Sequence, residues 1–247
     1  EKAGGDDLFG TLALTQDHTG AIFFLVVSAI WFGTSNAARE IVKERSIYLR
    51  ERMVNLGLVN YVFSKFVLLA LFCVVQCGML LGIVFVALGF NGGPMAFLQQ
   101  LAALVTTSVT AVALGLVLST LVTSSEAAMA LTPIALIPQV VLGGLMVPAT
   151  TIPKLAPVMN AIPARWGFEA TVVAERSAIA DEAAWLINLG GDKTSATDFI
   201  FGGQFQCATA QMASDTLNGA WSFSTYENVW MPYAVLGGMT LSLLFVI

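Results

Sequence analysis

A charged island, Arg39–Arg52, interrupts a chain that otherwise runs in long apolar segments. Five Lys/Arg and three Glu fall within its fourteen residues, whereas the neighbouring segment 20–38 has a single polar cluster and no charge. About 20 consecutive apolar residues cross a bilayer as a helix. The chain is 57% hydrophobic and only 11% charged, against about a quarter charged in soluble domains. It is therefore predicted to be an integral membrane protein.

The apolar segments predict the order of the membrane spans. We expect spans at residues 20–38, 58–90, 97–122, 127–147 and 230–247. A loop at residues 1–19 precedes the first span, segment 39–57 connects the first two spans, and segment 148–229 contains short helices and a loop domain before the last span. Pro133 and Pro138 are expected to bend the fourth of these spans. The predicted fold class is an all-α, polytopic helical bundle with five visible spans.

Charge is distributed unevenly between the connecting segments. The island carries a net charge of +2, residues 1–19 carry −3, and residues 148–228 carry −4. Lys and Arg near span ends favour the cytoplasm. We therefore expect segment 39–57 inside, and segments 1–19 and 148–229 outside, in the plasma membrane, or the inner membrane of a bacterium. An odd number of spans after an external start then predicts a further span upstream, if the parent protein begins in the cytoplasm.

The island itself has the pattern of an amphipathic helix at the inner interface. One broad arc of the helix carries its apolar residues, Ile41, Val42, Tyr48, Leu49, Met53 and Leu56. Arg45 and Arg52 intrude on that arc and need a carboxylate or a protein partner. The alternative is a solvated loop that only sets the topology.

The outer segment 148–229 opens with four prolines among apolar residues too few to cross a bilayer. Two short re-entrant or interfacial helices fit this pattern. Cys207 is the single cysteine of the segment, which indicates a free thiol or an intermolecular disulfide. Cys73 and Cys77 are expected to be buried within a span.

Known catalytic patterns are missing from the sequence. Lys193 does not directly follow a glycine, so residues 189–195 do not form a phosphate loop. The single histidine, His18, has neither a cysteine nor a second histidine nearby for a metal site. Whether the parent protein is an enzyme stays open, but any energy source has to come from another domain or subunit.

The sequence resembles a known family, the ABCG-type ABC transporters. The resemblance is carried, in order, by segments 19–25, 40–45, 48–52, 61–65, 143–148 and 162–170, the last reading Ile-Pro-Ala-Arg-Trp-Gly-Phe-Glu-Ala. It implies a six-span exporter domain that works as a dimer, with the first span and a cytoplasmic ATP-binding cassette upstream. ATP and Mg would bind on that nucleotide-binding domain, not on this chain.

The resemblance also implies roles for individual residues. Contact with the ATPase domain falls on the coupling helix within 39–57, at Glu44, Arg45, Tyr48, Arg50, Glu51 and Arg52. A substrate cavity at the dimer axis falls on Ser28, Trp31, Phe32, Asn36, Ile137, Val140 and Val141, and an outer plug on Leu145 and Met146. Such an apolar, aromatic pocket suits a lipophilic or amphipathic substrate, such as a lipid, a sterol-like or a drug-like molecule.

Two other functions stay open. The chain could be a separate permease subunit of a lipid or polysaccharide exporter, with its cassette on another polypeptide. It could also be a non-transporting scaffold or receptor whose outer domain binds a ligand. The expected partners are a nucleotide-binding domain, a second copy of the chain and the lipid bilayer, and no nucleic acid.

Overall fold

The computed structural model describes residues 4–51, 53, 57–88, 93–143, 156–174 and 230–247. Within these ranges every regular element is a helix. The labelled helices are α1 (Gly4–Ala37), α2 (Glu40–Glu51), α3 (Leu58–Leu88), α4 (Gly93–Leu121), α5 (Ser125–Leu142), α6 (Ala156–Asn160) and α10 (Met231–Val246). A further helix occupies residues 163–174 and is called the 163–174 helix below. The predicted all-α class is confirmed.

Within the described residues, four stretches are long and apolar enough to cross a membrane. They are Gly20–Glu51, Leu58–Ala87, Phe97–Leu121 and Ser125–Leu142, close to the first four predicted spans. The chain turns at Ala38 and Arg39 within the first stretch, so that α2 is a separate helix after α1. The last predicted span corresponds to α10, an apolar helix of 16 residues. The chain is a multi-pass membrane protein.

The prediction of a loop before the first span is wrong for residues 4–19. Helix α1 is continuous from Gly4 to Ala37 and is 34 residues long. The segment contains no proline and has several good helix formers, among them Leu8, Leu12 and Leu14. Extending an existing helix adds one hydrogen bond per residue fixed, so a polar end can stay helical beyond the apolar part.

Helix α4 lies at the centre of the bundle, where it contacts α1, α2, α3, α5 and α10. Small residues allow its close approach to α1. A Cβ added at Gly115 would lie 2.7 Å from the Thr34 carbonyl oxygen and 2.8 Å from Ala37 Cβ. Thr107 and Thr110 of α4 are fully buried. Small residues at these positions let α1 and α4 pack closely, as is common between membrane helices.

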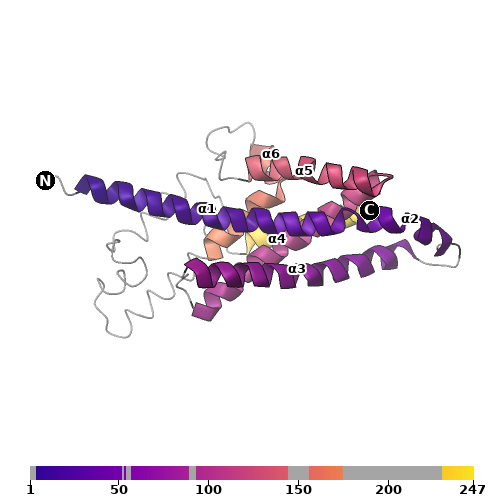
Figure 1. Ribbon diagram of the computed structural model, residues 1–247, viewed down its shortest axis with the longest axis horizontal. Helices are drawn as coiled ribbons and strands as arrows, with labels where there is room; N and C mark the ends of the chain where they lie inside the picture. Colours follow the sequence, from indigo (N-terminus) through magenta and orange to yellow (C-terminus); the bar gives the residue numbers. More distant parts are fainter. Residues whose placement is uncertain (1–3, 52, 54–56, 89–92, 144–155, 175–229) are drawn as a thin grey trace.

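The bundle has two distinct ends (Figure 1). Helix α2, the start of α3 and the C-terminal end of α10 lie at one end. The N-terminal part of α1 and the end of α3 lie at the other. The described part of the charged island thus lies at one end of the bundle. This is the position expected for a segment that connects two successive spans.

Helix α5 and the 163–174 helix are joined by a side-chain cap. The Ala164 N–H donates to Gln139 Oε1 at 3.1 Å, and Gln139 is buried within α5. The first N–H groups of a helix have no partner within it, so Gln139 satisfies one of them. Pro133 and Pro138 lie inside α5, which nonetheless is one uninterrupted helix. Helix α6 and the 163–174 helix are each too short to cross a bilayer.

Candidate functional site

Helix α2 is fastened to the start of α3 by a cluster of charged and aromatic side chains. Lys65 Nζ lies 2.6 Å from Glu44 Oε1 and 3.5 Å from Glu40 Oε2. The Tyr61 hydroxyl donates to Glu44 Oε2 at 3.2 Å. The ring of Tyr48 packs on that of Tyr61, with centroids 4.8 Å apart. Glu40 and Glu44 are one turn apart on α2, so that both carboxylates reach the same ammonium group.

Helix α2 is also fastened to α4, at its first turn. Ser119 Oγ accepts hydrogen bonds from the Ile41 N–H at 3.1 Å and the Val42 N–H at 3.0 Å. These are N–H groups that a helix start leaves without an internal partner, and Ser119 is almost completely buried. A residue of another helix therefore provides the cap. The first two turns of α2 are held to both α3 and α4, and we call this arrangement the α2 clamp.

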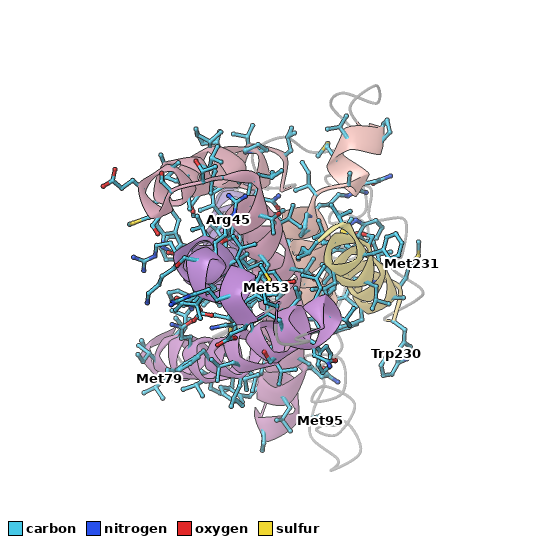
Figure 2. All side chains as sticks on the ribbon, turned by 90° about the vertical axis from the view of Figure 1, so that its right-hand side faces the viewer. Arg45, Met53, Met79, Met95, Trp230 and Met231 are labelled. Carbon is cyan, nitrogen blue, oxygen red and sulfur yellow. The ribbon has the colours of Figure 1, made fainter. Side chains whose placement is uncertain are left out.

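The side chains of α2 outside the clamp are exposed, and this exposed surface is called the outer face of α2. It includes Arg45, Arg50 and Glu51, together with the apolar Ile47 and Leu49, which are 45% and 53% exposed. Figure 2 looks onto this end of the bundle and shows Arg45 and Met53 there. The face combines positive charge with apolar surface, a composition that suits docking of a protein partner.

The six residues predicted for contact with an ATPase domain separate into two groups. Glu44 and Tyr48 turn inward to α3 and belong to the α2 clamp. Arg45, Arg50 and Glu51 point outward, and Arg52 lies outside the described residues. The sequence predicted no contact for Glu40, Tyr61, Lys65 or Ser119. Tyr61 and Lys65 are four residues apart, as are Glu40 and Glu44. This matching spacing is the sequence signal that pointed to a contact between the two pairs, whereas no signal pointed to Ser119.

The residues predicted to line a cavity lie on α1 and α5. Trp31, Ile137 and Val141 are exposed, with 48%, 61% and 40% of their surface accessible. Phe32 and Val140 are half-buried, and Val140 packs against the cluster around Phe168. An apolar face of α1 and α5 is thus open to a partner or to lipid.

The two polar residues of that predicted cavity have partners within the chain. The Ser28 hydroxyl donates to the Phe24 carbonyl oxygen at 2.8 Å. The Asn36 amide donates to Gln76 Oε1 of α3, also at 2.8 Å, so Asn36 joins two helices. The predicted plug residues Leu145 and Met146, and Cys207, lie outside the described residues.

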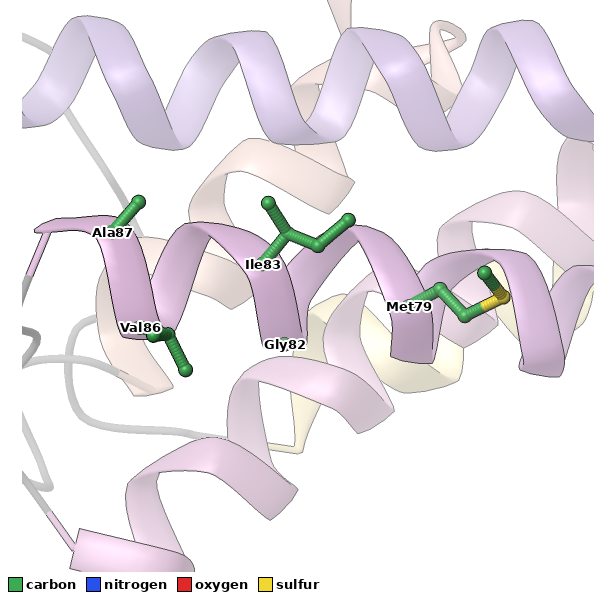
Figure 3. Close-up of a pocket in the computed structure, with 5 residues that line it drawn as sticks. All are labelled: Met79, Gly82, Ile83, Val86 and Ala87. Carbon is green, nitrogen blue, oxygen red and sulfur yellow. The ribbon is translucent and has the colours of Figure 1, made fainter.

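A shallow apolar depression of about 570 Å³ lies elsewhere, on the outward face of α3 (Figure 3). Met79, Gly82, Ile83, Val86 and Ala87 line it. Ligand sites combine apolar walls with a few polar groups that fix orientation, and these five residues offer none. The depression is part of an apolar helix surface and does not coincide with the predicted cavity on α1 and α5.

A second polar cluster lies on the 163–174 helix. Arg165 is 6% exposed and Glu169, one turn later, is fully buried. Burial raises the pKa of Glu169 to about 7, although the nearby Arg165 opposes the shift. Burial also lowers the pKa of Arg165, opposed by the charge of Glu169. The Arg165 guanidinium lies over the ring of Trp166, 5.5 Å from its centroid. Both residues lie in segment 162–170, but the sequence pattern predicted no role for either of them.

The long apolar helices define a polytopic helical membrane domain. Residues 7–175 match the family of the ABC-2 type transporter, and the chain belongs to that family. It is 34% identical over 161 residues to the ABC transporter ATP-binding/permease protein Rv1747 of Mycobacterium tuberculosis. The match covers 63% of this chain but 19% of that relative, so the chain spans about a fifth of the relative's length.

Proposed function

We propose that this chain is the membrane domain of an ATP-driven exporter of the ABCG type, which moves a lipophilic or amphipathic molecule outward. Its family is that of ABC-2 type transporters. The relative with 34% identity is named as an ATP-binding/permease protein. That name supports a nucleotide-binding domain on the same polypeptide, where ATP and Mg would bind. The alternative of a cassette on a separate subunit has no comparable support.

The observation that carries the proposal is the α2 clamp. A helix that receives force from an ATPase domain has to expose one face to that domain and pass the movement to the spans. The inner face of α2 is tied to α3 through Glu44 and Lys65, and to α4 through Ser119. Its outer face presents Arg45 and Arg50. Rotation of α2 would therefore move α3 and α4 together.

The path of the substrate is proposed between two copies of the chain. The exposed apolar residues of α1 and α5, Trp31, Ile137 and Val141, would face their counterparts in the second copy. Closing of the two cassettes would bring these faces together and push the substrate past Leu145 and Met146. The charged end of the bundle would lie in the cytoplasm, at the plasma membrane or bacterial inner membrane.

ATP hydrolysis by the full-length parent protein in lipid nanodiscs tests this proposal. A panel of lipids and amphipathic compounds is added to the wild type, to Arg45→Glu and to a matched variant, Glu126→Gln, at an exposed position of α5. We expect some compounds to stimulate hydrolysis several-fold in the wild type and in Glu126→Gln. Arg45→Glu should lose this response while its elution in size-exclusion chromatography is unchanged. Equal stimulation in all three proteins would refute the role of the outer face of α2.

A further inference from the structure

Among the charged residues in the described part of the chain, Glu169 has the least favourable environment for its charge. Its side chain is fully buried, and neither Oε1 nor Oε2 has a hydrogen-bond partner. A buried carboxylate without donors costs several kcal/mol, unless it is paired or takes up a proton. The structure around Glu169 thus favours the neutral carboxylic acid.

The helix that carries Glu169 is held on three sides. Phe168 packs edge-on against Phe23 of α1, with ring centroids 5.4 Å apart. A Cβ added at Gly167 would meet the Thr107 side chain of α4 at 2.5 Å. Gln139 of α5 accepts from the Ala164 N–H. The backbone therefore cannot shift to expose Glu169 without breaking contacts with three spans.

Among the described residues, Arg165 is the charged group that acts on Glu169. It lies one turn earlier on the same helix, and its positive charge favours the Glu169 carboxylate. Burial has the larger effect, so the pKa of Glu169 is raised from 4.5 to about 7. Residues 20–37 of α1, all of α4 and all of α10 contain no Asp, Glu, Lys, Arg or His. The one charged residue of α5, Glu126, is thirteen positions from Gln139, about 20 Å along a helix. The phenol of Tyr233 on α10 donates to the Gln99 carbonyl oxygen at 3.5 Å.

We propose that the Glu169 carboxyl group is a proton-binding site that links the packing of the 163–174 helix against α1, α4 and α5 to pH. The protonated form is neutral and fits its buried position. The deprotonated form needs donors that the described residues do not supply, and therefore favours a loosened helix. Between the ordinary carboxyl range and neutral pH the folded protein holds a proton that the unfolded chain releases, so its stability falls as pH rises through this window. The inference does not depend on transport.

Infrared difference spectroscopy of the full-length parent in nanodiscs tests this proposal directly. The carbonyl stretch of a protonated carboxyl group is followed from pH 4 to pH 9 in the wild type, Glu169→Gln and Glu126→Gln. We expect one carboxyl group with a midpoint near pH 7, absent in Glu169→Gln and retained in Glu126→Gln. A wild type whose carboxyl groups have all titrated by pH 6, or a neutral-range signal that persists in Glu169→Gln, would overturn the proposal.

A second measurement covers the case in which Glu169→Gln does not fold. Arg165→Gln removes the positive charge that favours the carboxylate, and it should move the midpoint to higher pH. Amide hydrogen exchange of residues 163–174, corrected for its intrinsic pH dependence, should become faster above neutral pH in the wild type. An unshifted midpoint in Arg165→Gln, or exchange independent of pH in the wild type, contradicts the link. Because neither measurement uses ATP or substrate, failure of the exporter proposal leaves this test intact.

Discussion

Gly33 of α1 shows how little space separates α1 from α4. A Cβ at this position would lie 2.8 Å from Ala111 Cβ and closer still to the Ser108 carbonyl oxygen. Gly33→Ala is therefore expected to force the two helices apart, at a cost of about 1–3 kcal/mol for overpacking. Thermal unfolding in detergent, followed by size-exclusion chromatography, should show a lower melting temperature.

The matched control for Gly33 is Gly82 of α3, where an added Cβ meets nothing within 4 Å. Gly82→Ala should be neutral or slightly stabilising, because alanine is the better helix former by about 1 kcal/mol. Equal melting temperatures for Gly33→Ala and Gly82→Ala would show that the α1–α4 contact is looser than the structure has it.

At the scale of elements, the α2 clamp predicts a specific pattern in double mutants. Glu44→Gln and Lys65→Met each remove one partner of a 2.6 Å ion pair that is less than one-third exposed. We expect each to destabilise the protein by about 1–3 kcal/mol, and the double mutant to cost clearly less than both together. Thermal unfolding of the four proteins gives the interaction energy.

Glu51→Gln, at the exposed end of α2, serves as the control for this cycle. Its effect should add to that of Lys65→Met, because Glu51 has no ion pair with Lys65 in the structure. If Glu44 and Lys65 also behaved additively, the clamp would be a surface ion pair of little energetic weight.

The helices themselves were predictable, since hydropathy and length are properties of the local sequence. Spans expected to begin at residues 58 and 127 correspond to helices that begin at Leu58 and Ser125. The clamp was not predictable, because which face of α2 turns to Lys65 depends on how α2 and α3 pack. Glu169 was missed for the same reason. Glu169 lies within segment 162–170 of the resemblance, but its burial between spans is a tertiary property.

For the whole molecule, the central question is what covers the exposed apolar face of α1 and α5. In a two-fold symmetric dimer, a residue near the axis lies opposite its own counterpart. If the proposed cavity lies on that axis, Ile137→Cys should be cross-linked to itself by a short bifunctional thiol reagent in the full-length parent, on a Cys207→Ser background. Val86→Cys on the outer side of α3 is even more exposed, at 85% against 61% for Ile137, and should give little dimer. A cross-linked dimer with Val86→Cys and none with Ile137→Cys would place α3 at the interface and leave α1 and α5 facing lipid.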